Sequence, residues 1–293
     1  MNITITAMNK ITLALLSLFL LNLNIWNAAP SNSDEITLCH IPATEQFAGF
    51  SKDVEFLKAH KDPRPLLFQS KAGKTITFDT PDGQKGSGYA FENATKTKNY
   101  LFVIHEWYGL NGHIKSQAEK LFNDLDNVNV IALDIYDGKV ADNGRDAGQL
   151  MQSVKTERAE AIIKGAMAHA GTDARIYTIG WCFGGSWSLQ ASLLAKDQAA
   201  GCVIYYGMPE KDVSKLKNLS TDVLGIWAAK ERWINPQVVA QFEADMKAAG
   251  KQLSSNSYEA GHGFANPSNP VFDAESSADA YAKTLSFLKS RME

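Results

Sequence analysis

The sequence has no excess of positive charge. Its 29 lysine and arginine residues are outnumbered by 32 aspartate and glutamate residues, which gives a formal charge of −3 at pH 7, and the basic residues are scattered along the chain. Domains that bind nucleic acid concentrate basic side chains on one face. The charge pattern therefore argues against nucleic acid as a partner.

Cysteine is scarce, and neither cysteine nor histidine is spaced as in a metal site. The three cysteines, Cys39, Cys182 and Cys202, are an odd number, so at least one stays unpaired within the chain even in an oxidising compartment. No CxxC pair occurs, and the six histidines lack ligand spacing, so we expect no metal and no cofactor. Cys202 lies in an apolar run and is expected to pack as a small hydrophobic residue, whereas the state of Cys39 stays open.

Long apolar runs are missing except for a short one near the N-terminus. Lys10 precedes the apolar residues 11–21, and small and polar residues follow as far as Pro30. This order is typical of a secretory signal peptide, and the run is shorter than the roughly 20 residues that span a bilayer. We expect residues 1–29 to be the signal peptide of a secreted or periplasmic protein. An uncleaved anchor is the alternative, and no other membrane contact is expected.

Repeats, low-complexity tracts and a second domain pattern are absent as well. After an N-terminal extension over residues 30–71, a hairpin is expected within residues 75–91, followed by apolar runs that alternate with helical patterns. Such runs, separated by helices, predict a mostly parallel sheet with helices on both faces, hence an α/β fold, which we expect to be monomeric. Strands are expected at residues 100–105, 128–136, 175–179, 202–206, 223–227 and 253–258, and helices at residues 114–125, 146–170, 186–195, 237–249 and 278–291.

Residues 180–185 read Gly-Trp-Cys-Phe-Gly-Gly and lie between an expected strand and an expected helix. A Gly-x-nucleophile-x-Gly turn in that position is the nucleophile elbow of α/β-hydrolases, normally built around serine. Cys182 at its centre would stand over the first turn of the helix, whose positive end favours a thiolate. The alternative is a buried cysteine in a glycine-rich turn.

An elbow nucleophile requires an acid and a histidine after it in the chain, in that order. His262 directly follows the last expected strand, and Glu231 follows the strand before it. A carboxylate at that place would hold one imidazole nitrogen and fix the tautomer. The alternatives are a histidine in a surface loop and a solvated charge in a Lys-Glu-Arg run.

From about Thr75 to its C-terminus, the chain resembles the dienelactone hydrolase family. The resemblance rests on the Gly-Trp-Cys-Phe-Gly-Gly elbow, on the spacing of Cys182, Glu231 and His262, and on the segment His-Glu-Trp-Tyr-Gly-Leu-Asn at residues 105–111. It implies that residues 72–293 form an α/β-hydrolase domain that cleaves a small carboxylic ester or lactone.

The resemblance also implies a role for each matching residue. Cys182 attacks the carbonyl and forms a thioester, His262 relays the proton, and Glu231 orients His262. Glu106 contacts Cys182 and modulates its thiol–thiolate balance. The backbone N–H groups of Trp107 and Phe183 hold the oxyanion.

Two departures from the family bear on the acid's placement and on the substrate. Glu231 replaces the usual aspartate, and the family's substrate-binding arginines are missing from residues 137–139 and 265–267, so Lys139 or Arg232 would have to substitute. Aromatic residues flank the expected site and predict an apolar pocket for a small apolar or aromatic ester. The candidate pocket residues are Tyr108, Trp181, Trp233, Phe264, Lys139 and Arg232.

Two other functions stay open from the sequence. The first is a hydrolase fold kept only for binding, with Glu231 misplaced. The second is a thiol redox role for Cys182, although no second cysteine lies nearby in the sequence to resolve it.

Overall fold

The computed structural model describes residues 41–60 and 62–292, all within one unit of the chain. The expected signal peptide and Cys39 lie outside the described residues. Within the described part, no helix is both long enough and apolar enough to cross a bilayer.

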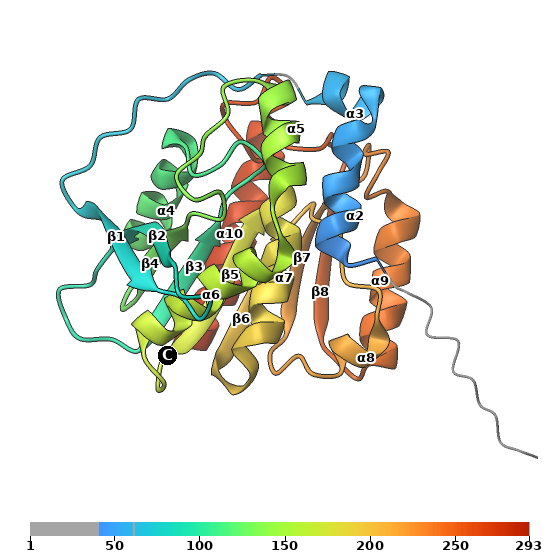
Figure 1. Ribbon diagram of the computed structural model, residues 1–293. Helices are drawn as coiled ribbons and strands as arrows, with labels where there is room; N and C mark the ends of the chain where they lie inside the picture. The colour runs from blue at the N-terminus through green and yellow to red at the C-terminus, as the bar shows by residue number, and fades with distance from the viewer. Residues whose placement is uncertain (1–40, 61, 293) are drawn as a thin grey trace, which may run out of the picture. The chain divides into compact units, whose positions relative to one another are not determined.

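An eight-stranded sheet lies at the centre of the described residues (Figure 1). Its spatial order is β1-β2-β4-β3-β5-β6-β7-β8, with the β1–β2 hairpin and the β2–β4 pair antiparallel and the remaining pairs parallel. Strands β4 and β7 are buried along their whole length, as expected for a sheet covered on both faces. The strands are β1 (Gly73–Asp79), β2 (Lys85–Phe91), β3 (Asn99–Ile104), β4 (Asn129–Leu133), β5 (Arg175–Trp181), β6 (Ala199–Tyr205), β7 (Val223–Ala228) and β8 (Leu253–Tyr258).

Helices cover both faces of this sheet. In Figure 1, α6 and α7 lie in front of the strands, and α4 and α10 lie behind them. This arrangement confirms the predicted α/β architecture. The helices are α4 (Gly112–Asp124), α5 (Gly144–Ser153), α6 (Thr156–Ala170), α7 (Phe183–Ala195), α8 (Val213–Leu216), α9 (Pro236–Ala248) and α10 (Ala274–Met292), with a 3-10 turn η2 at Lys196–Gln198.

The single helix expected over residues 146–170 is wrong, because α5 and α6 are separate helices. Val154 and Lys155 between them have extended backbone angles. The two helices pack against different partners: α6 contacts the sheet and α7, whereas α5 contacts the N-terminal helices. Tertiary packing therefore overrides a continuous helical pattern here.

Residues 41–60, which we call the N-terminal segment, join the core of the unit. They form α2 (Ala43–Gly49), a 3-10 turn η1 (Phe50–Lys52) and α3 (Val54–Ala59). Helices this short are marginal on their own, so burial must hold them in place. Phe47 and Phe56 are fully buried, and α2 packs against α5 and α7. The blue helices beside α5 in Figure 1 show this placement.

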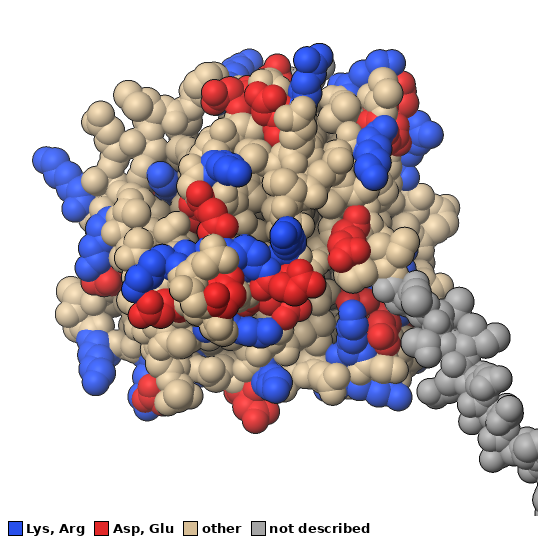
Figure 2. Space-filling view, viewed as in Figure 1, with Lys and Arg blue, Asp and Glu red and all other residues tan. Residues whose placement is uncertain are grey.

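Charged side chains of both signs are interspersed on the face shown in Figure 2. Some opposite charges are paired: the Arg158 guanidinium lies 3.0 Å from Asp82 Oδ2 and 2.6 Å from Asp137 Oδ1. This face therefore offers no extended field of one sign.

Candidate active site

Cys182 occupies a strained turn between β5 and α7. Its φ of 58° and ψ of −123° lie in a region that an L-residue adopts only when its surroundings hold it there. Its N–H donates to the Tyr205 carbonyl at 2.9 Å. A Cβ on Gly184 would come 2.3 Å from the Ile104 carbonyl oxygen, and one on Gly180 would come 2.0 Å from the Gly184 carbonyl oxygen. The glycines predicted for the elbow are therefore required by close packing.

The sulphur of Cys182 is enclosed, since the residue is only 2% exposed. Burial raises the pKa of its thiol, and the nearby Glu106 carboxylate acts in the same direction. The His262 ring and the Phe183 N–H lower it, because both favour a negative sulphur. Cys202 differs: its buried sulphur lies 3.7 Å from the Ser188 hydroxyl, and burial raises its pKa, in keeping with a packing role.

His262 and Glu231 form a buried pair beside Cys182. Glu231 lies three residues after β7, and His262 lies in the loop after β8, as the chain order predicted. His262 Nδ1 is 2.7 Å from Glu231 Oε1, and Oε1 also accepts the Ile234 N–H at 3.2 Å. Burial alone would lower the pKa of His262, but the Glu231 carboxylate and a negatively charged Cys182 sulphur together raise it well above 6.5, which stabilises the imidazolium that forms when the thiol proton is transferred. Glu231 thus reaches the histidine despite its extra methylene.

Glu106 lies two positions after the end of β3 and is buried near Cys182. Its Oε2 accepts a hydrogen bond from Asn266 Nδ2 at 2.5 Å. Asn266 is itself fixed, because its Oδ1 accepts the Ser268 N–H at 2.8 Å and the Ser268 hydroxyl at 2.6 Å. Burial raises the pKa of Glu106 to about 7, although Asn266 and His262 oppose the shift. The sequence reasoning missed Asn266, which stands where the family arginine was sought.

The two residues expected to supply oxyanion N–H groups follow neighbouring strands. Trp107 lies three positions after the end of β3 and Phe183 two positions after the end of β5, and these strands pair in parallel with Ile104 opposite Gly180. The Phe183 N–H is at the free N-terminus of α7, where it stabilises a negative Cys182 sulphur. The arrangement is compatible with the expected roles, which stay predictions.

Three of the aromatic residues predicted for the pocket, Tyr108, Trp181 and Phe264, are buried. Trp181 packs against Tyr205, with ring centroids 5.4 Å apart, and Tyr108 packs against Trp107 at 5.1 Å. Phe264 is fully buried. Trp233 is half-buried and contacts the N-terminal segment, and a role for it in the pocket stays a prediction.

Trp233 is a contact point between the loop after β7 and the N-terminal segment. Its Nε1 donates to Asp53 Oδ2 at 3.0 Å, and its ring centroid is 5.0 Å from that of Phe56. The two candidate cations, Lys139 and Arg232, are exposed, and no described contact joins either to Cys182, Glu106 or His262. An anion-binding role for them stays a prediction.

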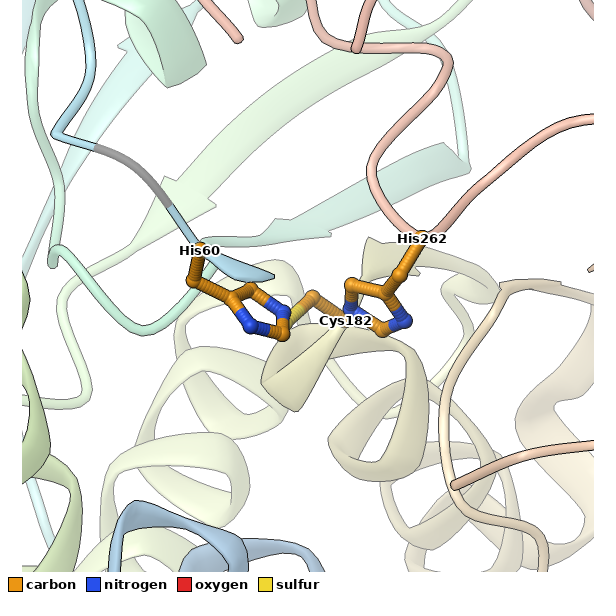
Figure 3. A group of neighbouring side chains, drawn as sticks. All are labelled: His60, Cys182 and His262. Atoms are coloured by element: carbon orange, nitrogen blue, oxygen red, sulfur yellow. The ribbon is translucent and has the colours of Figure 1, made fainter. Parts of the chain in front are cut away.

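The N-terminal segment brings an additional histidine to Cys182. In Figure 3, the rings of His60 and His262 lie on opposite sides of the Cys182 side chain, each with a nitrogen toward the sulphur. The His60 ring centroid is 4.7 Å from that of His262 and 5.1 Å from that of Trp107. Burial and the neighbouring His262 lower the pKa of His60 to about 3, so its ring is neutral. No sequence signal pointed to His60, because it lies far from the hydrolase motifs.

Tyr206 is a further residue that the sequence reasoning missed. It follows β6 with a φ of 37°, and its ring centroid is 4.9 Å from that of His262. Its hydroxyl is buried and has no hydrogen-bond partner among the described residues. Burial raises the pKa of Tyr206 well above 10, so the hydroxyl keeps its proton and can donate.

A surface pocket of about 900 Å³ reaches His60 from outside. It runs between the end of the N-terminal segment and the start of α5, and it contains none of the residues that the sequence predicted for the pocket. Its lining residues are Leu57, His60, Asp62, Asn143, Gly144, Arg145 and Asp146. His60 therefore lines this pocket and also lies beside Cys182.

The sequence and the fold were compared with known proteins. Residues 87–292 match the model of the dienelactone hydrolase family. Protein usf of Aquifex pyrophilus is 25% identical over 220 residues, which cover 68% of this chain and 95% of that protein. Carboxymethylenebutenolidase 1 of Cupriavidus pinatubonensis is 24% identical over 227 residues, which cover 73% and 95% of the two chains.

The fold was also found among solved structures. A dienelactone hydrolase-like promiscuous phosphotriesterase from metagenomic libraries superposes with a TM-score of 0.64 at 18% identity, covering 75% of this chain and 99% of that one. At this identity the likeness shows the fold alone, and it confirms the predicted α/β-hydrolase fold.

Proposed function

Because the chain belongs to the dienelactone hydrolase family, we propose that it hydrolyses small carboxylic esters or lactones through a thioester on Cys182. The observation that carries this proposal is the convergence of three buried groups in the chain order of an α/β-hydrolase. Cys182 lies in the strained turn before α7, His262 faces it, and Glu231 is 2.7 Å from the far nitrogen of His262.

The first half-reaction follows from this geometry. His262 Nε2 accepts the thiol proton as the sulphur of Cys182 attacks the ester carbonyl, and the Glu231 carboxylate stabilises the resulting imidazolium. The tetrahedral oxyanion is held by the N–H groups of Phe183 and Trp107. Collapse breaks the ester C–O bond, and the leaving alkoxide takes the proton from His262, which leaves a thioester on Cys182.

The second half-reaction returns the site to its starting state. His262 removes a proton from water, the hydroxide attacks the thioester carbonyl, and the C–S bond breaks. The proton then returns from His262 to the sulphur as the carboxylic acid departs. Nothing is oxidised or reduced, and no cofactor is required.

Glu106 would tune the first step. Its pKa near 7 keeps it divided between the acid and the carboxylate at neutral pH. A carboxylate beside Cys182 disfavours the thiolate, so the resting sulphur stays a thiol until substrate and His262 act together. This would protect the sulphur from oxidation between turnovers.

The surroundings of Cys182 favour an uncharged substrate. The rings of Tyr206, Phe56 and Trp107 pack against His262 or His60, the two histidines beside Cys182, and the candidate cations Lys139 and Arg232 are exposed. A carboxylate on the substrate would have no described cation against it beside the sulphur. We propose a small neutral or aromatic ester as the preferred class.

The test is hydrolysis of an activated aryl acetate by the full-length protein. Cys182→Ala should lose at least a thousandfold in kcat, whereas Cys202→Ala, which removes the other described buried thiol, should keep most of it. Equal turnover by wild type and Cys182→Ala would refute the mechanism. A panel of anionic lactones and neutral esters tests the substrate class, and a strong preference for the anionic set would contradict it.

Secretion is proposed separately from the chemistry. Residues 1–29 have the order of a signal peptide. Mass spectrometry of the protein from its native compartment should find a chain that begins close to residue 30, and a full-length chain in the membrane fraction would favour the anchor instead.

A further inference from the structure

His60 presents an unused nitrogen lone pair beside the thiol. Its Nδ1 lies 2.7 Å from the Phe56 carbonyl oxygen, an acceptor, so Nδ1 carries the proton and Nε2 carries the lone pair. Nε2 is buried and has no hydrogen-bond partner among the described residues. A buried polar atom without a partner is costly and needs an explanation.

Another buried histidine of the same fold shows the contrast. His105 uses both ring nitrogens within the fold, since Nδ1 lies 2.6 Å from the Glu106 carbonyl oxygen and Nε2 accepts the Ile135 N–H at 3.1 Å. It therefore has nothing left for a ligand. His60 satisfies one nitrogen in the same way but leaves the other facing the site (Figure 3).

Three donor atoms converge at this point. The nitrogen of His60, the sulphur of Cys182 and the nitrogen of His262 all lie within 4.8 Å of one another. In a tetrahedral zinc site, bonds of about 2.0 Å to nitrogen and 2.3 Å to sulphur place donors roughly 3.3–3.6 Å apart. Rotamer shifts of about 1 Å would bring the three atoms to that spacing around one cation.

Both histidines are also oriented as metal ligands are. His262 Nδ1 faces the Glu231 carboxylate at 2.7 Å, and His60 Nδ1 faces a backbone carbonyl at the same distance. A carboxylate or carbonyl behind the imidazole fixes the tautomer whose Nε2 can bind a metal. The two supports come from distant parts of the chain and direct both lone pairs toward the one sulphur.

We propose that His60, Cys182 and His262 form a three-ligand site for Zn²⁺, with water in the fourth position, and that bound zinc reversibly blocks the thiol. Binding replaces the S–H bond of Cys182 with a Zn–S bond and releases one proton to solvent, while each imidazole donates its Nε2 lone pair and the oxidation states do not change. The block of hydrolysis rests on the proposed function, but the metal site does not.

The pocket beside His60 offers the cation a route. It is lined by two carboxylates, Asp62 and Asp146, against the single cation Arg145. His60 lines this pocket and is one of the three donors, so a cation that enters the pocket reaches the site at His60.

The test begins with binding, measured without reference to activity. Metal-free full-length protein, kept reduced by an agent that does not chelate zinc, should take up one Zn²⁺ in equilibrium dialysis. Co²⁺ used as a probe should give the intense visible bands of a tetrahedral site and a thiolate-to-cobalt charge-transfer band. His60→Ala should weaken Zn²⁺ binding by at least the 10- to 100-fold that loss of a supporting contact causes.

Two further variants keep the test decisive. His60→Gln maintains a polar side chain of similar reach in case the alanine variant does not fold, and it should also lose affinity. His169→Ala, which removes an exposed histidine outside the site, is the matched control and should bind Zn²⁺ like wild type. Equal zinc affinity in wild type, His60→Ala and His60→Gln would overturn the site.

Activity then separates this proposal from the previous one. Zn²⁺ should inhibit ester hydrolysis at the concentration at which it binds, and EDTA should restore the rate. One equivalent of bound zinc in a protein whose turnover survives Cys182→Ala would support the site and refute the thioester mechanism. Turnover that requires Cys182, with no stoichiometric zinc bound, would refute the site alone.

Discussion

Two regions of the molecule enclose the sulphur of Cys182, and they are built on different principles. The sheet region, formed by the strand ends and loops that carry Glu106, Cys182 and His262, places each group by its position after a parallel strand. The N-terminal segment places Phe56 and His60 by packing two short helices over that edge. The reactive groups of the sheet region are therefore placed by local sequence patterns at strand ends. The residues that surround these groups and limit access to them are placed by tertiary packing.

The strongest test of the sheet region is to remove its base. His262→Ala should lower kcat on an activated ester by roughly 10⁴-fold, because the thiol then keeps its proton during attack. Glu231→Gln should cost less, since the imidazole remains but loses the carboxylate 2.7 Å from Nδ1. Steady-state kinetics on both variants measures this order. A loss in Glu231→Gln larger than that in His262→Ala would contradict the assigned roles.

The packing of the N-terminal segment is tested by Phe56→Ala. Phe56 is fully buried and contacts Phe47, Trp107 and Trp233, so the substitution should lower the free energy of unfolding by about 3–5 kcal/mol. Amide hydrogen exchange in residues 43–60 should rise more than in β5. The exposed Leu67, at 86% exposure, is the control, and Leu67→Ala should be nearly neutral. An equal rise in amide hydrogen exchange in residues 43–60 and in β5 would contradict the view that burial of Phe56 holds the N-terminal segment in place.

Glu106 should give the sheet region a pH signature. Its folded pKa of about 7 lies above the ordinary 4.5, so the folded state binds more protons between these values and stability falls as pH rises through that window. The cost is fully present above pH 7 and amounts to about 3 kcal/mol at most. Glu106→Gln should remove it. Denaturant unfolding from pH 4.5 to 8 measures the slope, and an unchanged slope in the variant would contradict the assignment.

The smallest expected effect concerns the hydrogen bond between the two regions. Trp233→Phe keeps the ring but removes the Nε1 donor to Asp53 Oδ2, at 3.0 Å. Loss of one such bond should cost about 1 kcal/mol, seen as faster exchange of the N-terminal segment with little change in kcat. A thousandfold loss of kcat would instead place Trp233 in the chemistry.

Most of the sheet region could be predicted from the sequence, and the reason is physical. Continuous apolar strands and a glycine-rich turn are local patterns, and the order of Cys182, Glu231 and His262 follows from where parallel strands end. The same reasoning failed for the helix over residues 146–170, where α5 turns to meet the N-terminal segment. The helical periodicity of residues 146–170 carries no information about the contact between α5 and the N-terminal segment.

The rest of the site could not be predicted because it depends on contacts between residues distant in the chain. His60 lies far from any hydrolase motif and reaches Cys182 only because Phe47 and Phe56 are buried beside it. Asn266 carries no catalytic signature, and its contact with Glu106 appears only when two loops meet. The contacts of the Trp233 ring with Asp53 and Phe56 likewise join residues that are distant in the chain.

The most direct measurement is the mass of the protein during turnover. Full-length enzyme mixed with an activated acyl ester and quenched in acid within milliseconds should carry one acyl group, located by peptide mapping on Cys182 and released by hydroxylamine as expected for a thioester. Cys202→Ala should show the same adduct. Rapid turnover with no acylated protein, or an acyl group on any other residue, would contradict the account of this site.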